Sequence, residues 1–282
     1  KILIIGFGKM GLSHFKSFYN KDFIIHIVEK KINQNVIEIK KSDLFEKKFF
    51  IFKKIPKKQK YLLTISATQS KDRFYSLKNF FENNKTRFLL LEKFCFLRSS
   101  QFDKFKSKFS FKTKTFVNSW AYIVSNKVKL KPIKQKNRFT LKCIVNEGDL
   151  FANITHILHF FCYLNNNIKI DELRFKEFKI IKSKKRDFYN EFLGSIIIKD
   201  QNQNKLIIKT KKFKSIIMNF FINNKVSNVN FRLKIKKNTD ISFYNSKRIE
   251  KNYKFPFSKI TSYIFLKRCM KKNFSYLPTF ND

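Results

Sequence analysis

The stretch Lys1-Ile-Leu-Ile-Ile-Gly6-Phe-Gly8-Lys-Met-Gly11 is the most informative part of this chain. A short apolar run leads directly into the pattern G-x-G-x-x-G and then into a segment of helical character. In that order Gly6 allows a tight turn, Gly8 lets the backbone approach a ligand, and Gly11 lets the helix pack closely on the strand. The N-terminal N–H groups of the helix would face a diphosphate, so the stretch predicts a dinucleotide site. The intervening residues of this predicted site are Phe7, Lys9 and Met10.

An acidic residue is expected about 20 residues beyond the glycines, where its carboxylate accepts hydrogen bonds from the adenosine ribose. Glu29 fits, because it follows the apolar run Phe23–Val28 and a helix predicted over about Leu12–Tyr19. The alternative is that Glu29 is only a solvated strand end. Lys30 and Lys31 keep the choice of nucleotide open, since a cation here could hold a 2′-phosphate. Glu29 favours NAD over NADP.

The composition is that of a globular protein with a large positive charge. Its 282 residues suffice for two domains with their own cores, and 43% hydrophobic residues argue against disorder. A formal charge of +42 implies salt-sensitive affinity for polyanions, and a basic nucleic-acid-binding protein stays a distant alternative. However, only 9 of the 62 basic residues are Arg, and Lys, Asn, Ile and Phe are abundant while Gly and Pro are scarce. An AT-rich genome explains this bias at least as well as a selected partner does.

Cysteine usage and hydropathy favour a cytoplasmic protein. The four cysteines are far apart and form no C-x-x-C pair, which argues against a zinc knuckle and a redox dithiol. No run approaches the roughly 18 uninterrupted apolar residues of a membrane helix, and the chain opens on a core strand rather than a signal peptide. Because it begins with Lys1 rather than Met, the chain is not taken as complete at either end.

Alternating strands and helices in the first 120 residues predict a parallel, doubly wound sheet. This α/β part is a predicted Rossmann domain over residues 1–118. The predicted strands after the first two are Lys48–Phe52, Tyr61–Ser66, Arg87–Leu91 and Thr115–Val117. The predicted helices between them are Lys71–Asn83 and Ser100–Ser107.

The pattern changes from Trp120 onward, where one helix over Leu150–Leu164 precedes long alternating segments. Those segments predict an open, mainly antiparallel sheet, and residues 119–282 therefore form a predicted α+β domain for substrate binding and oligomerisation. The alternating segments are Gly194–Lys199, Lys205–Lys211 and Asn230–Lys236.

Four motifs resemble, in order, those of the Gfo/Idh/MocA oxidoreductases, the glucose-fructose oxidoreductase or inositol 2-dehydrogenase family. They are Gly6-Phe-Gly-Lys-Met-Gly-Leu-Ser-His14, Ile65-Ser-Ala-Thr68, Glu92-Lys93-Phe94 and Asn153-x-x-His156. The resemblance implies a Rossmann domain followed by an open antiparallel sheet domain. It also implies hydride transfer between NAD or NADP and a sugar, nucleotide-sugar or cyclitol, in a homo-oligomer such as a dimer or tetramer. No specific nucleic acid and no membrane is implied as a partner.

The resemblance makes Lys93 the lysine of an E-K-P motif, beside the nicotinamide and the substrate hydroxyl, where it assists proton transfer. Phe94 replaces the proline, so we expect an altered turn. A lysine at the end of a buried strand can be partly desolvated, which favours proton exchange. The alternative is an ordinary surface lysine. The remaining residues of the predicted cofactor site are Ala67, Thr68 and Glu92.

His156 matches the histidine of the family's D-x-G-x-H helix, an acid/base partner near the reacting carbon. Ala152 and Ile154 replace the aspartate and the glycine of that motif, so a catalytically degenerate nucleotide- or sugar-binding relative stays a second hypothesis. Asn153, His156 and Phe160 share one helical face, which lines a substrate pocket or fills the core.

The substrate domain offers few further signals. Trp120 and Arg186 are predicted substrate contacts, with Tyr122, Asp187 and Tyr189 as further polar or stacking candidates. The spacing of His156 and His159 is that of a metal pair, but no further ligand accompanies them, and we predict no metal site.

Overall fold

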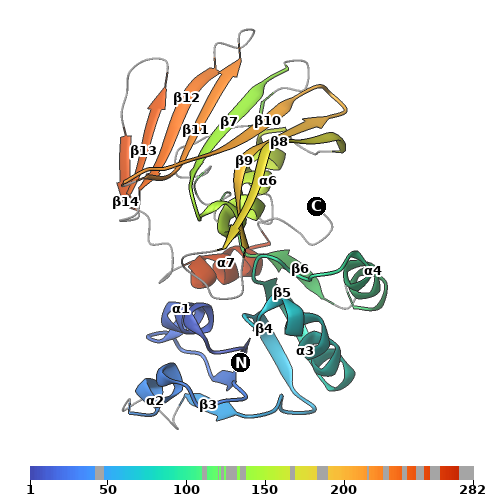
Figure 1. Ribbon diagram of the computed structural model, residues 1–282. Coiled ribbons are helices and arrows are strands. Elements are labelled where there is room, and N and C mark those ends of the chain that lie inside the picture. The colour runs from blue at the N-terminus through green and yellow to red at the C-terminus, as the bar shows by residue number, and fades with distance from the viewer. Residues whose placement is uncertain are drawn as a thin grey trace. The chain divides into compact units, whose positions relative to one another are not determined.

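The computed structural model describes residues 1–41, 48–109, 113–119, 121, 124, 132–133, 138–165, 169–182, 190–214, 216–224, 229–236, 240–245, 251–254 and 261–272. The chain divides into two compact units, and Figure 1 labels the elements of both. The first unit holds residues 1–119 and the C-terminal segment from 256, and the second holds residues 120–255.

The first unit is built on a six-stranded, all-parallel sheet with the strand order β3-β2-β1-β4-β5-β6. The chain winds outward from β1 to one edge and then, from β4, to the other, as the predicted doubly wound sheet requires. The strands are β1 (Ile2–Ile5), β2 (Ile25–Val28), β3 (Phe49–Phe52), β4 (Lys60–Ser66), β5 (Lys85–Leu91) and β6 (Lys114–Val117). The helices are α1 (Lys9–Phe18), α2 (Gln34–Lys40), α3 (Ser70–Asn83), α4 (Ser99–Lys108) and α7 (Thr261–Met270).

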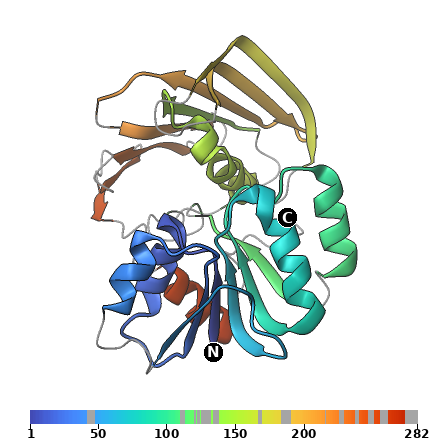
Figure 2. The ribbon, with the colours of Figure 1, turned by 60° about the horizontal axis from the view of Figure 1, so that its bottom comes forward.

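Apolar residues on both faces bury this sheet between helices, as parallel sheets require. All four residues of β1 are buried, and Figure 2 shows α1 and α7 on one side of the sheet and α3 and α4 on the other. Phenylalanine fills the α3 and α4 side, where Phe80, Phe81 and Phe105 belong to one core cluster. The predicted Rossmann fold is thereby confirmed.

Helix α1 begins at Lys9, three residues before the helix start predicted at Leu12. Its first turn therefore includes the last glycine of the pattern, and Gly8 is its N-cap. The consequence is that the helix N-terminus lies within the glycine bend itself.

The C-terminal helix α7 belongs to the first unit, although residues 119–282 were predicted to form the second domain. Its apolar face buries Phe265, Leu266 and Cys269. The Phe265 ring lies 5.2 Å from that of Phe116 on β6. A short amphipathic segment in a lysine-rich terminus carries no signal of its packing partner, so only the tertiary structure assigns it.

The second unit is an eight-stranded sheet with the order β14-β13-β12-β11-β7-β10-β9-β8. Its pairs are antiparallel except for β7 with β10, which is parallel, so the predicted mainly antiparallel sheet is confirmed. Helix α6 (Leu150–Asn165) packs on β7 and β9. The strands are β7 (Thr140–Asn146), β8 (Ile170–Lys182), β9 (Asn190–Asp200), β10 (Lys205–Lys211), β11 (Ile216–Asn224), β12 (Val229–Lys236), β13 (Asp240–Asn245) and β14 (Lys251–Lys254).

None of the helices in the described ranges combines the length and the apolar character needed to cross a membrane.

Candidate dinucleotide site

The loops that follow β1, β2, β4 and β5 meet at one edge of the parallel sheet. The last residues of these strands are aligned, with Ile5 opposite both Val28 and Ser66, and Ser66 opposite Leu91. The strand order reverses between β1 and β4, and such a switch point at the carboxyl ends of strands is where open α/β sheets bind ligands. The predicted cofactor residues therefore come from loops at the carboxyl-terminal edge of the sheet, where such ligands bind.

The glycine bend, Gly6–Gly11, needs two of its glycines for the fold itself. Gly6 has φ +91°, a conformation that L-residues with side chains rarely adopt, and a Cβ there would lie 2.8 Å from the amide N of Thr68. A Cβ on Gly11 would lie 2.1 Å from the carbonyl oxygen of Gly6. The bend is thus packed tightly against the Ala67–Thr68 loop on one side and against α1 on the other.

Gly8 is different, because none of the described residues requires a glycine there. Its φ of −74° suits any residue, and a Cβ at Gly8 would meet no atom of a described residue beyond its chain neighbours within 4 Å. Gly8, Lys9 and Met10 are exposed, and the N-cap, being glycine, has no side chain to bind the first N–H groups of α1. The first N–H groups of a helix lack intrahelical acceptors, so open space in front of them suits an anion.

The one bulky apolar side chain at the start of the bend points away from that space. Phe7 is fully buried, and its ring meets the Phe15 ring edge-on at 5.8 Å. The bend is therefore not filled by its own side chains. A diphosphate fits the residues present: an open Gly8, an exposed helix N-terminus and a backbone curve that a side chain at Gly6 or Gly11 would obstruct.

Glu29 lies directly beside the bend, as its spacing predicted. Its Oε2 accepts a hydrogen bond of 2.6 Å from the backbone N–H of Phe7, and the side chain is half-buried. The carbonyl oxygen of the same residue, Phe7, accepts hydrogen bonds from the Nδ2 groups of Asn33 and Asn35 at 3.2 and 3.1 Å. Side chains after β2 and at the start of α2 thus hold the bend by both backbone polar groups of Phe7.

Glu92 directly follows β5, and its carboxylate is buried. The carboxylate oxygen Oε1 lies 2.8 Å from Nε2 of His14 and accepts a 2.5 Å hydrogen bond from Nδ2 of Asn118. His14 is in turn 2.6 Å from the Ser262 hydroxyl of α7 through Nδ1. Burial alone would raise the pKa of Glu92, but hydrogen bonds from His14 and Asn118 and the charge of Lys93 hold it below the ordinary value.

Lys93 is half-buried in the turn that follows, and Phe94 has φ +53°. The ring of a proline fixes φ near −65°, so the proline of the resembled E-K-P motif could not adopt this conformation. The turn therefore differs from a proline turn, as the substitution led us to expect.

Four residues that hold these loops escaped the sequence analysis. His14 was named only as the last residue of the glycine motif, Ser262 lies 248 residues away from it, and Asn118 directly follows a strand. The fourth is Arg73 of α3, which is buried. Asn118 carried a usable signal, since polar residues just after parallel strands gather at the ligand edge; Arg73 carried one only as a charge at a buried helical position.

The second-domain candidates lie on or near α6. His156 is 6% exposed and Phe160 fully buried, whereas Asn153 is half-buried and donates a 2.8 Å hydrogen bond to the carbonyl oxygen of Asp149. His156 thus belongs to the packed face of α6 in the second unit, and Lys93 belongs to the first unit. The catalytic role of His156 stays a prediction.

The other predicted substrate contacts, Trp120 and Arg186, lie outside the described residues, as do Tyr122, Asp187 and Tyr189. Within the described ranges, no group of three histidine, cysteine, aspartate or glutamate side chains is placed to hold a metal ion.

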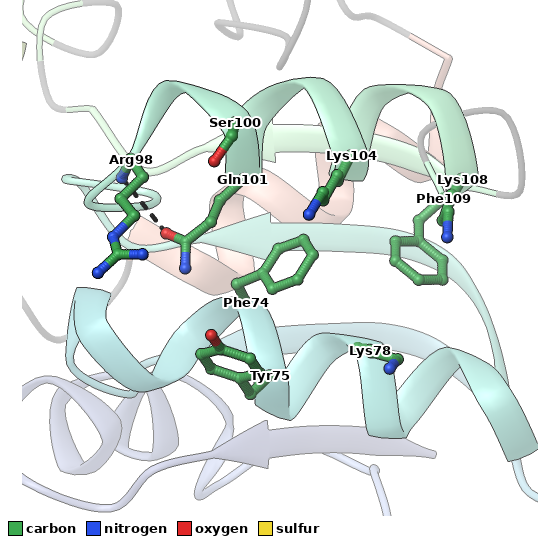
Figure 3. A pocket seen from close by; sticks show the side chains of 9 residues that line it. All are labelled: Phe74, Tyr75, Lys78, Arg98, Ser100, Gln101, Lys104, Lys108 and Phe109. Atoms are coloured by element: carbon green, nitrogen blue, oxygen red, sulfur yellow. Dashed lines mark hydrogen bonds between the residues drawn. The ribbon is translucent and has the colours of Figure 1, made fainter.

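A cavity of about 310 Å³ lies between α3 and α4 (Figure 3). It contains no residue of the glycine bend, of Glu29 or of the Lys93 turn, so it is separate from the candidate site. Exposed cations line its rim and two buried phenylalanines its floor. The lining residues are Phe74, Tyr75, Lys78, Arg98, Ser100, Gln101, Lys104, Lys108 and Phe109.

Sheet order and glycine bend together define a Rossmann-domain protein with an appended, mainly antiparallel sheet domain. No protein-family model and no curated protein matches the chain. Among solved structures, a dehydrogenase from Chromobacterium violaceum is similar over 99% of this chain and 90% of its own, with a TM-score of 0.64 at 8% identity. A dehydrogenase from Clostridium difficile is similar over 96% and 91%, with a TM-score of 0.63 at 8% identity.

The transcriptional regulator Gal80p from Kluyveromyces lactis has the same fold, with a TM-score of 0.63 at 10% identity over 98% of this chain and 84% of its own. These structures share the two-part architecture implied by the resemblance to Gfo/Idh/MocA oxidoreductases, and that architecture is confirmed for this chain. At such low identity the likeness establishes the fold alone.

Proposed function

We propose that this chain is an NAD(P)-dependent oxidoreductase that transfers a hydride between the nicotinamide and a hydroxyl or carbonyl carbon of a sugar, nucleotide-sugar or cyclitol. One observation carries the proposal: Gly8 is a glycine that the fold does not need, in open space at the exposed N-terminus of α1. Where the fold itself does not require a glycine, a ligand that approaches the backbone closely can require one. A dinucleotide diphosphate is such a ligand.

Different loops of the first unit would bind different parts of the dinucleotide. The amides of the glycine bend would hold the diphosphate, Glu29 the adenosine ribose, and the Ala67–Thr68 loop the next part of the dinucleotide. When bound, the nicotinamide supplies hydride exchange. Lys93 would hold or move the hydroxyl proton at its Nζ, and His156 of the second unit is the proposed second acid/base group.

Glu29 supports NAD over NADP. Its carboxylate already lies at the bend, 2.6 Å from the Phe7 amide, and a 2′-phosphate beside it would meet a like charge. Lys30 and Lys31 are exposed neighbours and weaken that repulsion. In Glu29→Gln we expect the ratio of the NADP and NAD dissociation constants to fall by about tenfold, as for the loss of one charged hydrogen-bond acceptor.

The decisive test is calorimetric titration of NAD and NADP into the wild type and into Gly8→Leu. We expect the wild type to bind and Gly8→Leu to lose about a hundredfold in affinity or more, because the new side chain occupies the space before α1. The thermal midpoint of the free protein should stay unchanged, since no described residue other than the chain neighbours lies within 4 Å of that side chain's Cβ.

Ser100→Leu is the matched control, because Ser100 is an exposed residue in the first turn of α4, away from the bend. It should leave nucleotide binding intact. If the wild type binds neither nucleotide, or if Gly8→Leu binds as well as the wild type, the proposed function is wrong.

A second candidate is a catalytically degenerate relative that binds a nucleotide or a sugar without turnover. Ala152 and Ile154 favour it, since they replace the aspartate and glycine of the resembled histidine motif. The shared fold with the regulator Gal80p supports the same alternative. Nucleotide binding with no turnover on a panel of sugars, nucleotide-sugars and cyclitols would select this candidate. Tight, salt-sensitive oligonucleotide binding without nicotinamide binding would instead select the distant nucleic-acid alternative.

A further inference from the structure

Arg73 of α3 lies beneath the turn that carries Lys93 and is 2% exposed. Its Nη1 lies 2.7, 3.3, 2.7 and 3.2 Å from the carbonyl oxygens of the four successive residues Glu92–Cys95. Its Nη2 donates a 2.5 Å hydrogen bond to the carbonyl oxygen of Thr68. One guanidinium therefore connects the loop after β4 with the turn after β5.

Among the described residues, the hydrogen bonds of Arg73 come from its two Nη groups. Its Nε–H is buried and finds no acceptor among the described residues. The carboxylate of Glu92, whose charge acts on Arg73, is hydrogen-bonded to His14 and Asn118 instead. Burying a charge is costly unless it is paired, so this arginine is stabilised chiefly by the carbonyl dipoles of the turn.

The turn needs such a contact because its carbonyls converge. Phe94 adopts φ +53°, and a residue with a side chain in that region costs about 1 kcal/mol or more. Such a conformation persists where the surroundings over-determine it. Here the surroundings hold the turn twice: Arg73 binds the carbonyls, and His14 with Asn118 binds the carboxylate of Glu92.

We propose that Arg73 is the positioning residue of the Lys93 turn: its guanidinium fixes the place of the Lys93 amine and makes the Thr68 loop and the Glu92–Cys95 turn move as one body. The functional part of this inference rests on the proposed role of Lys93 in proton transfer. Arg73 itself touches neither substrate nor cofactor.

The test compares Arg73→Lys with Arg87→Lys, a matched control at an exposed arginine of β5. Lysine keeps the charge of Arg73 but cannot bridge five carbonyls. In Arg73→Lys we expect amide hydrogen exchange in residues 92–97 to accelerate by about tenfold or more, with exchange in β1 unchanged. The pH profile for acetylation of the Lys93 amine, followed by peptide mass spectrometry, should shift in this variant only.

Unchanged exchange in residues 92–97, or exchange accelerated equally throughout residues 1–119, would overturn the positioning role. If Arg73→Lys does not fold, the ¹⁵N NMR signals of the guanidinium groups in the wild type test the positioning role instead. A clamped Arg73 gives separate, slowly exchanging Nη signals, whereas the exposed Arg87 gives averaged ones. Averaged Arg73 signals would contradict the proposal.

Activity distinguishes this inference from the proposed function. If the wild type turns over a polyol, Arg73→Lys should lower kcat by about tenfold and change the NAD dissociation constant by less than about twofold, because the glycine bend is untouched. Failure of the wild type to bind NAD(P) would contradict the proposed function. The exchange and acetylation data would still test the positioning role of Arg73. Normal NAD(P) binding with unaltered exchange in Arg73→Lys would contradict the positioning role of Arg73 alone.

Discussion

The bend after β1 and the turn after β5 lie on the same sheet edge but are built by opposite means. Gly6–Gly11 is shaped by missing side chains, since a Cβ at Gly6 or Gly11 would collide with backbone. The Lys93 turn is shaped by added ones, since Arg73 and His14 bind its carbonyls and its carboxylate. One loop is made by residues next to one another in sequence, and the other by residues brought from three helices and a strand end.

That difference teaches why one loop tolerates little local change and the other depends on distant elements. A substitution in the glycine bend acts through local backbone geometry. A substitution around the Lys93 turn acts through a buried polar network that reaches from α1 to α7. Three substitutions test the contrast between the two loops, and a pH dependence of the same unit provides a reference outside both.

The largest effect is expected at Gly11, and it separates the structural glycines from Gly8. The Cβ of Gly11→Ala would stand 2.1 Å from the carbonyl oxygen of Gly6, so α1 must move off β1. We expect a loss of about 3 kcal/mol or more in the free energy of unfolding, measured in urea. Gly8→Ala is the control and should lose less than about 0.5 kcal/mol. Equal losses in both variants would contradict the division of roles within the bend.

The next effect tests the network under the Lys93 turn. In Glu92→Gln, the side chain keeps its shape but loses the charge that His14 and Asn118 approach at 2.8 and 2.5 Å. We expect a loss of about 2 kcal/mol in the free energy of unfolding, because hydrogen bonds to a buried charged group are worth about that much. Glu82→Gln, at an exposed position of α3, should change it by less than about 0.5 kcal/mol. An unchanged Glu92→Gln would mean that the carboxylate stabilises nothing.

The sequence predicted the glycine bend, which is made by neighbouring residues. It did not predict the distant residues that support the Lys93 turn. The glycine pattern and Glu29 were located correctly beside each other, because their spacing follows from one strand, one turn and one helix. Lys93 was placed correctly at the end of β5, yet its supports were not. Arg73, Asn118 and Ser262 reach their partners only through tertiary packing, and hydrogen bonds between residues 19 to 248 positions apart leave no periodic signal in one sequence.

Some strands could be predicted from the sequence and others could not. β1, β4 and β5 were predictable because buried parallel strands are continuous apolar runs. β8 was not predicted, since its thirteen residues mix charges with exposed apolar side chains at a sheet edge. The parallel pairing of β7 with β10 was missed as well, because strand partners are set by topology rather than by alternation.

A smaller effect tests whether the C-terminal helix contributes to the Lys93 turn. Ser262→Ala removes the hydroxyl 2.6 Å from Nδ1 of His14 and leaves the rest of α7 in place. We expect a loss of about 1 kcal/mol in the free energy of unfolding, typical of one neutral hydrogen bond. Hydrogen exchange in residues 92–97 should rise in this variant while exchange in residues 6–11 stays as in the wild type. Equal changes in both loops would show that α7 stabilises the whole unit rather than the turn.

The smallest effect is a pH dependence that belongs to neither loop. His26 on β2 lies 2.9 Å from the Tyr61 hydroxyl through Nδ1, and burial, then the charges of Lys1 and the N-terminal amine, hold its pKa below 6.5. The native state therefore resists protonation more than the unfolded state does, so its stability is full above pH 6.5 and declines as the pH falls from there toward the lowered pKa. The thermal midpoint of the wild type should drop between about pH 7 and about pH 5, and less steeply in His26→Gln. A parallel decline in both proteins would assign the acid sensitivity to other groups, and Glu92, whose low pKa keeps its contribution until more acidic pH, would not account for it in that range.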